Sequence, residues 1–121
     1  IATSPKVICD TGHNLHAMQT IAAQLQKEVY QNLWIVLGLV ADKDVSGLLA
    51  LMPRTAQYIF CQASIPRALN AEELAEKAAA FALKGRVVHN PKQALQKAQA
   101  LANEKDLIFV GGSTFVVAEI L

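Results

Sequence analysis

The feature of this sequence that most constrains its fold is a regular change in the spacing of its apolar residues. Short apolar runs, typical of buried strands, occur at residues 6–9, 33–40, 57–61, 86–89 and 107–110. Between them, apolar residues recur every three or four positions, as in amphipathic helices, at residues 14–29, 45–52, 71–82 and 91–102. A last helix is expected after Thr114. Five strand–helix repeats predict an α/β fold with three αβα layers and a mostly parallel, Rossmann-like sheet of about five strands.

Several residues indicate where the helices begin and end. Asn70 and Asn90 are expected to cap the helices that follow them, Asn70 together with Glu73 in a capping box. Gly85 is expected to stop the helix that begins after Asn70. The apolar stripe of the first helix runs as far as Val29, so this helix is expected to extend that far. In the fourth helix, Leu101 is expected to be among the buried residues.

Composition restricts the class of protein. A chain of 121 residues that is 53% hydrophobic is expected to form one domain with a hydrophobic core. Its formal net charge of +1 does not indicate a large basic surface for binding nucleic acid. No apolar run approaches the roughly 20 residues that span a bilayer, and no signal-peptide pattern opens the sequence. The chain starts at Ile1 rather than Met, so we expect a piece of a longer protein. Cys9 and Cys61 are expected to be reduced, buried thiols of a cytoplasmic protein.

Polar residues follow the strands at one end of the expected sheet. Asp10-Thr11-Gly12-His13-Asn14 follows the first strand, Asp42-Lys43-Asp44 the second, and Pro66-Arg67 the third. Gly111-Gly112-Ser113-Thr114 follows the fifth. Because ligands of open parallel sheets bind at the carboxyl ends of the strands, these loops are the candidate binding site. The connections at the other end, such as Asn103-Glu104-Lys105, are plainer.

Each of these loops also has a purely structural interpretation. Asn14, Asp42 and Asp44 are suited to capping the helices that follow them, and Lys43 to a solvated position. Gly111-Gly112 is compatible with a tight turn, or with backbone N–H groups that hold an anion.

His13 is harder to explain structurally, because it lies three residues after Asp10 in a glycine-containing turn. Such a pair can bind a ribose hydroxyl, a phosphate or a carboxylate. We expect no metal site in this chain, because no third or fourth ligand clusters with the pair. Neither a phosphate-binding Gly-Lys-Ser/Thr motif nor Gly-x-Gly-x-x-Gly is present.

Four of these segments together resemble a known family. Asp10-Thr11-Gly12-His13-Asn14 is similar to the Asp-Gly-Ala-His-Asn signature that opens the C-terminal domain of folylpolyglutamate and dihydrofolate synthases, members of the Mur ligase superfamily. Residues 37–44, 63–69 and 110–115 resemble, in order, the family's Gly-Met-x-x-Asp-Lys-Asp, Pro-Arg-Ala and closing Gly-Ser segments. The chain departs from the family pattern at Thr11, Gly12 and Leu15, where Gly, Ala and Pro are usual.

The resemblance implies that residues 1–121 are the C-terminal, glutamate ligase domain of an ATP-dependent ligase. In that family, ATP phosphorylates a carboxylate of the folate substrate, and the amine of L-glutamate attacks the acyl phosphate. The N-terminal domain of the same protein, absent from this chain, would hold most of the ATP, magnesium and folate contacts. The isolated chain is therefore expected to be inactive.

The resemblance also implies roles for individual residues, none of which is a nucleophile. Asp10, His13 and Asn14 would face ATP and glutamate, and Lys43 and Ser113 would contact phosphate or carboxylate groups. Weaker contacts of the same kind are implied for Gly111, Gly112 and Arg67.

A different class of function stays open at this point. A non-catalytic, Rossmann-like regulatory module that binds phosphate or a small molecule would also place Asp10 after its first strand. A receiver-like module would want a second acid there and a lysine at the end of the fifth strand, where this chain has Gly111-Gly112-Ser113.

Overall fold

A computed structural model of the chain describes residues 5–10, 15–41 and 44–120. Its strands are β1 (Lys6–Cys9), β2 (Leu33–Leu37), β3 (Gln57–Phe60), β4 (Gly85–Val87) and β5 (Leu107–Gly111). Its helices are α1 (Leu15–Gln26), α2 (Val45–Ala50), α3 (Ala71–Ala79), α4 (Pro91–Leu101) and α5 (Thr114–Ile120). The five strand–helix repeats and the α/β fold expected from the sequence are confirmed.

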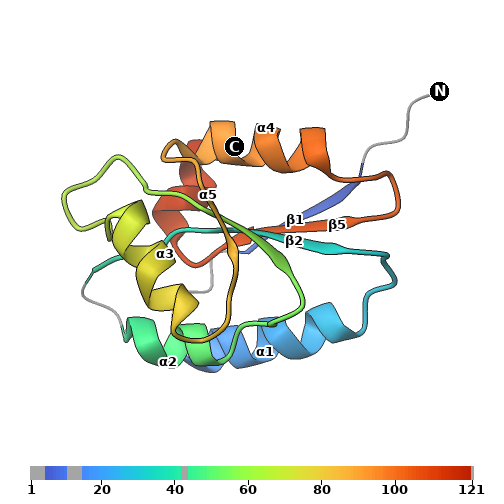
Figure 1. Ribbon diagram of the computed structural model, residues 1–121, viewed down its shortest axis with the longest axis horizontal. Coiled ribbons are helices and arrows are strands. Elements are labelled where there is room, and N and C mark those ends of the chain that lie inside the picture. Colours follow the sequence, from blue (N-terminus) through green and yellow to red (C-terminus); the bar gives the residue numbers. More distant parts are fainter. Residues whose placement is uncertain (1–4, 11–14, 42–43, 121) are drawn as a thin grey trace.

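The strands form one parallel sheet in the order β1-β5-β2-β3-β4. The chain first passes from β1 across to β2, β3 and β4, and then returns so that β5 fits between β1 and β2. Right-handed crossovers in two directions place helices on both faces. In Figure 1, α1 and α2 lie below the sheet, and α4 and α5 lie above it.

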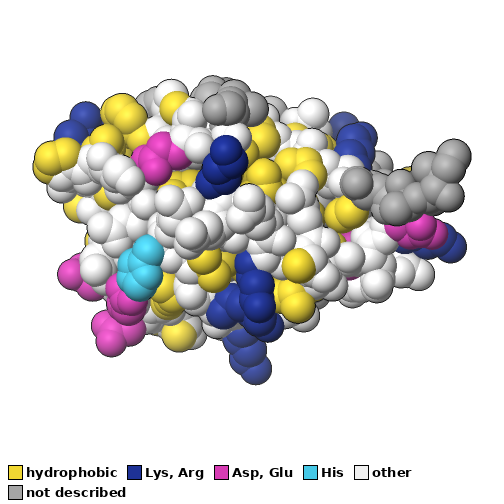
Figure 2. Space-filling model, turned by 90° about the horizontal axis from the view of Figure 1, so that it is seen from above, with side chains coloured by type: hydrophobic (Ala, Val, Ile, Leu, Met, Phe, Trp, Pro, Cys, Tyr) yellow, Lys and Arg dark blue, Asp and Glu magenta, His cyan; other side chains and the backbone are white. Residues whose placement is uncertain are grey.

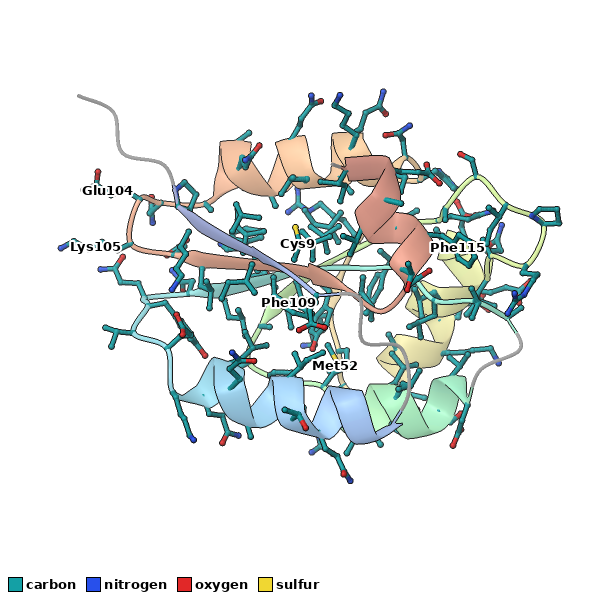
Figure 3. The ribbon with its side chains drawn as sticks, turned by 180° about the vertical axis from the view of Figure 1, so that it is seen from behind. Cys9, Met52, Glu104, Lys105, Phe109 and Phe115 are labelled. Atoms are coloured by element: carbon teal, nitrogen blue, oxygen red, sulfur yellow. The ribbon has the colours of Figure 1, made fainter. Side chains whose placement is uncertain are left out.

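Two apolar cores lie on the two faces of the sheet. Because successive strand residues point to opposite faces, Ile35 and Leu37 pack toward α1, α2 and α3, while Val36 packs toward α4 and α5. All three side chains are fully buried, which confirms that β2 is covered on both faces. In Figure 3, Phe109 of β5 and Met52 lie on the α1–α2 side of the sheet.

Two helices end differently from the expectation. α1 ends at Gln26, and Val29 is fully exposed rather than part of a buried stripe. Lys27 and Glu28 donate backbone hydrogen bonds to the carbonyls three residues earlier, which tightens the end of the helix. At the end of α4, Leu101 is 39% exposed, whereas Ala94 and Ala98 of the same helix are fully buried against the sheet.

The expected stop of α3 at Gly85 is also wrong. The helix ends at Ala79, and Ala82 takes the left-handed conformation with φ of 63°. Leu83 then donates its N–H to the carbonyl of Ala78 at 3.1 Å, the bond that closes a Schellman motif. Gly85 instead lies in β4, where a Cβ atom would stand 2.2 Å from the backbone oxygen of Tyr58. This glycine therefore serves the close approach of β4 to β3.

The conformation of Ala82 leads to a stability prediction. An L-residue in the left-handed region costs about 1–2 kcal/mol that glycine avoids, partly offset by the greater chain entropy of glycine. We expect Ala82→Gly to raise the free energy of unfolding by about 0.5–1 kcal/mol in urea denaturation. The control Ala79→Gly, inside the helix, should lower it by a similar amount. A loss of stability in both variants would contradict this explanation of the helix end.

The two cysteines differ from each other. Both are free, and Cys61 is buried as expected, whereas Cys9 is exposed because β1 is an edge strand of the sheet. Burial, and then the charge of Glu119, raises the pKa of the Cys61 thiol to about 12. Within the residues that the structure describes, no helix is both long and apolar enough to cross a bilayer.

Candidate functional site

The candidate site lies where β1, β5 and β2 reach the carboxyl edge of the sheet. β5 is between the other two strands, and α5 leaves it toward one face, while α1 and α2 leave β1 and β2 toward the opposite face. Helices that diverge from adjacent strands leave a crevice at their carboxyl ends, which is where open α/β sheets bind ligands. Figure 3 shows Phe115 of α5 at this edge, and Glu104 and Lys105 at the opposite edge.

The sequence prediction that Asp10 and Gly111 lie at the same edge of the sheet is confirmed, and the structure shows that their strands are neighbours. The backbone N–H of Asp10 donates to Val110 at 3.0 Å, which holds the acid beside the end of β5. On the other side of β5, the N–H of Gly38 faces the carbonyl of Gly111 at 3.4 Å. Asp10 is partly exposed at this edge of the sheet.

The glycines at the end of β5 are required by close packing. Gly112 has φ of +95°, and a Cβ there would stand 2.6 Å from the carbonyl oxygen of Gly38. A Cβ on Gly111 would stand 2.6 Å from the ring of Phe109. Glycine therefore lets the ends of β5 and β2 meet, and the anion-binding role of these two residues stays a prediction.

Ser113 follows directly and is 2% exposed. Its Oγ accepts a hydrogen bond from the N–H of Phe115 at 3.1 Å, so it fixes the start of α5. A hydroxyl that accepts one bond keeps its own hydrogen for donation, so contact with a carboxylate or phosphate remains chemically possible.

The loop after β3 adds Arg67 to the same edge. The side chain of Arg67 is exposed, and its carbonyl accepts the N–H of Ala41 at 2.7 Å. Val40 and Ala68 form an antiparallel bridge beside this bond. The loops after β2 and β3 are thus joined, an arrangement that the sequence did not reveal because it depends on strand order.

Three of the predicted site residues, His13, Asn14 and Lys43, lie outside the described residues, as does Asp42. Their roles remain predictions. For Asp44, the structural interpretation is confirmed, because its Oδ1 accepts the N–H of Gly47 at 3.0 Å and caps α2.

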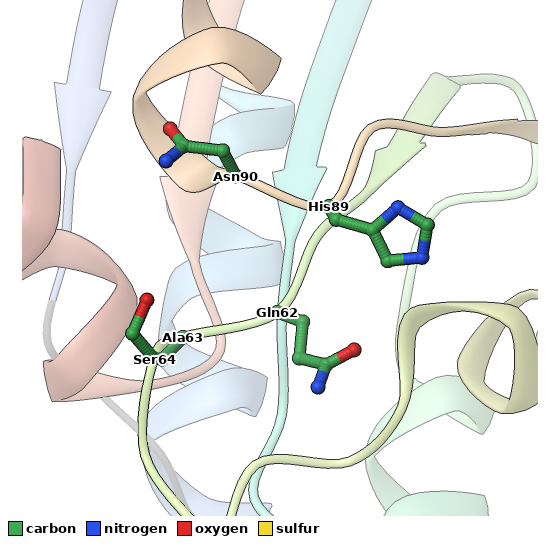
Figure 4. A pocket seen from close by; sticks show the side chains of 5 residues that line it. All are labelled: Gln62, Ala63, Ser64, His89 and Asn90. Atoms are coloured by element: carbon green, nitrogen blue, oxygen red, sulfur yellow. The ribbon is translucent and has the colours of Figure 1, made fainter.

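A pocket of about 280 Å³ lies between the ends of β3 and β4 and is lined by Gln62, Ala63, Ser64, His89 and Asn90. In Figure 4, Gln62 and His89 point to one side, and Asn90 and Ser64 to the other. Two of the polar groups already serve helices, since Gln62 Oε1 accepts from Ala71 and Asn90 Oδ1 accepts from Gln93. The polar side chains of this pocket therefore do not point toward one common position where a ligand could bind.

His89 of this pocket is paired with Glu72 of α3. Its Nε2 lies 2.6 Å from a carboxylate oxygen of Glu72, and this hydrogen bond holds the pKa of the Glu72 carboxyl below its usual value. The pair joins the start of α3 to the end of β4, as a surface contact rather than a catalytic one.

Charged groups are dispersed on the face of the molecule shown in Figure 2. No group of three or more His, Cys, Asp or Glu side chains suited to a metal occurs among residues 5–10, 15–41 and 44–120. On the face shown in Figure 2, the Lys and Arg side chains stand in separate groups, with neutral and hydrophobic surface between them. That face therefore lacks the continuous basic stripe typical of nucleic-acid binding.

Comparisons with known proteins agree with this geometry. The family model described as "Mur ligase, glutamate ligase domain" matches residues 1–114. The probable bifunctional folylpolyglutamate synthase/dihydropteroate synthase of Haloferax volcanii is 33% identical over 98% of this chain. The dihydrofolate synthase/folylpolyglutamate synthase of Escherichia coli is 31% identical over the whole chain. The chain spans 14% and 28% of the lengths of these two relatives.

A solved structure is similar over nearly the same span. A bifunctional folylpolyglutamate synthase/dihydrofolate synthase with Mn, AMPPNP and L-glutamate bound superposes with a TM-score of 0.87 and 26% identity. The superposition covers 99% of this chain and 29% of the solved one.

Proposed function

The chain belongs to the Mur ligase family of glutamate ligase domains, and from this premise we propose that it is the C-terminal domain of an ATP-dependent ligase that adds L-glutamate to folate or dihydropteroate. The observation that carries the proposal is the meeting of Asp10 with the glycine turn of β5 at the crevice between β1, β5 and β2. It is supported by relatives named as folylpolyglutamate and dihydrofolate synthases.

In the proposed reaction, a folate carboxylate takes the terminal phosphoryl group of ATP and becomes an acyl phosphate, with release of ADP. The amine of glutamate attacks the acyl carbon and phosphate leaves, giving the new amide. This chain contributes position and charge rather than a nucleophile. The Asp10 carboxylate would accept hydrogen bonds from ribose hydroxyls or from the glutamate ammonium, and Arg67 would pair with a substrate carboxylate.

Much of the ATP site would belong to the rest of the protein. This chain has no Gly-Lys-Ser/Thr phosphate loop, and its described residues do not form a group that fits a divalent metal. Magnesium, which would neutralise phosphate charge during transfer, is assigned to the preceding domain. A phosphate loop upstream of this domain in the full-length sequence would support the assignment, and its absence would exclude it. A cytoplasmic location is part of the same proposal, and cell fractionation tests it.

His13 gives the mutational test of the proposal. If His13 donates a hydrogen bond to a phosphate or carboxylate in the transition state, His13→Ala in the full-length enzyme should lower glutamate ligation by about 10-fold or more, equivalent to ~1.4 kcal/mol. The measurement is kcat/KM for ADP release in the presence of folate substrate and glutamate. Kinetics equal to those of the unmodified enzyme would remove His13 from the site.

A further inference from the structure

The carboxylate of Glu119 links α5 to the loop that follows β3. One oxygen, Oε2, accepts the backbone N–H of Ser64 at 2.5 Å, and the other, Oε1, accepts the Ser64 hydroxyl at 3.2 Å. Two bonds from one carboxylate to one residue fix both the place and the rotation of that residue.

The helix that carries Glu119 is firmly held. Val116 and Val117, on the inner face of α5, are 1% and 3% exposed in the core on that side of the sheet. The loop begins at Cys61, which is fully buried in the same core, and the nearby Glu119 charge contributes to the raised pKa of its thiol. Glu119 therefore connects the loop to a helix that is anchored in the core.

The other end of the loop is fixed independently. Leu69 donates its N–H to Leu39 at 2.9 Å, and Ala41 donates to Arg67 at 2.7 Å, on either side of the Val40–Ala68 bridge. The segment Ile65-Pro66-Arg67 is thus held between the Glu119 contact and this bridge. A further bond from Ala68 to the carbonyl of Ile65, at 3.1 Å, closes it as a tight turn.

We propose that Glu119 is a positioning residue that acts through Ser64 to hold Arg67 in place for binding of a substrate carboxylate. The inference rests on the proposed function, which supplies glutamate and folate as carboxylate substrates. The Glu119–Ser64 contact is exposed, and exposed polar contacts of charged groups contribute little to stability. Loss of Glu119 should therefore affect substrate binding much more than folding.

A double-mutant cycle in the full-length enzyme tests this role. Glu119→Ala should raise the KM for glutamate about 10-fold with kcat changed less than about 2-fold. The reason is that losing a contact made equally in the ground state and the transition state raises KM and leaves kcat unchanged. Arg67→Ala should raise the KM at least as much. If Glu119 acts through Arg67, the double variant should match Arg67→Ala alone, which is the signature of two coupled residues. If the KM increases of the two single variants multiply in the double variant, the two residues act independently and the proposal is wrong. An unchanged KM in Glu119→Ala would also overturn it.

Two controls separate positioning from general damage. Glu76→Ala removes an exposed glutamate of α3 and should leave the KM unchanged. Glu119→Gln keeps an oxygen acceptor for one of the two Ser64 bonds and should recover part of the lost binding.

A second readout separates this inference from the proposed function. Hydrogen exchange of residues 62–69 should be faster in Glu119→Ala than in the unmodified full-length protein. If the unmodified protein fails to ligate glutamate, the proposed function is wrong, and the exchange experiment alone decides whether Glu119 anchors the loop. Unchanged exchange would then overturn the anchor as well.

Discussion

Replacing Asp106 by alanine is expected to lower the free energy of unfolding by about 2–3 kcal/mol, because it removes a carboxylate that accepts four partly buried hydrogen bonds. Asp106 is 3% exposed. Its Oδ1 accepts the backbone and side-chain N–H groups of Asn32, both at 3.2 Å, and its Oδ2 accepts Trp34 Nε1 and the N–H of Asn103, both at 3.0 Å. One carboxylate thus joins the segments that lead into β2 and β5. Urea denaturation of the chain measures the loss.

The same group gives a pH dependence with a definite sign. Burial alone raises the pKa of the Asp106 carboxyl, but hydrogen bonds from Asn103, Trp34 and Asn32 outweigh it and hold that pKa below its usual value. The unfolded chain therefore takes up the proton first, and the stabilisation is complete above the unfolded pKa of about 3.9. It is lost as the pH falls through the folded pKa.

The variant Asp106→Asn, which cannot titrate, isolates this effect. Its single oxygen cannot replace both carboxylate oxygens, so it should be less stable than the unmodified chain at neutral pH. The difference in unfolding free energy between the two proteins should be constant above about pH 5 and should shrink below about pH 4. A difference that is independent of pH down to pH 2 would contradict a depressed pKa for Asp106.

Asp10→Ala in the full-length enzyme is expected to lower kcat/KM for glutamate ligation by about 100-fold, equivalent to ~2.7 kcal/mol. The reason is that a carboxylate hydrogen-bonded to a ligand contributes about 1.5–3 kcal/mol, and Asp10 stands at the crevice where β1 and β5 end. Asp10→Asn keeps the shape and one acceptor, so it should lose less. The measurement is steady-state ADP release at varied glutamate and ATP.

Two controls show whether the loss of activity comes from the Asp10 carboxylate: the substitutions should leave the fold intact, and a matched variant should stay active. The bond that places Asp10 beside β5 comes from its backbone N–H to Val110, so neither substitution removes it. Glu76→Gln, which removes an acidic charge from α3, should keep full activity. Activity of Asp10→Ala within 2-fold of the unmodified enzyme would exclude its carboxylate from the site.

Local signals in the sequence predicted much of this fold correctly. The bounds of β1 match because a short apolar run lies between Pro5 and Asp10. The start of α4 matches because Asn90 accepts from Gln93 and Pro91 takes the first helical position. Both signals act over three or four residues, and sequence spacing expresses such short-range effects directly.

The errors arose where distant parts of the chain decide the outcome. The exposure of Cys9 follows from the edge position of β1, and nothing near Cys9 in the sequence reveals the strand order. Likewise, α3 ends at Ala79 with Ala82 in the left-handed conformation, whereas Gly85 serves the close packing of β4 on Tyr58 of β3. A glycine in a sequence can end a helix or allow two strands to approach closely. The position of the neighbouring strand is needed to distinguish these two roles.

Part of the candidate site could be predicted from the sequence, and part of it could not. Asp10 and Gly111 were predicted to lie at the same edge because parallel strands end at one edge, which is a property of the fold class. The joining of Arg67 to the loop after β2, and the anchoring of Ser64 by Glu119, were not predictable. Ser64 and Glu119 are 55 positions apart, and their contact requires β3 and α5 to be placed first.

We propose that this chain forms one side of a glutamate-adding active site, whose other side belongs to the rest of the full-length protein. The most direct measurement is ADP release by the full-length protein supplied with ATP and dihydropteroate, with and without L-glutamate, together with mass analysis of the product. We predict that ADP release requires both dihydropteroate and glutamate and that the product gains one glutamyl residue through an amide. ADP release that is independent of glutamate, or the absence of a glutamylated product, would show that the proposed function is wrong.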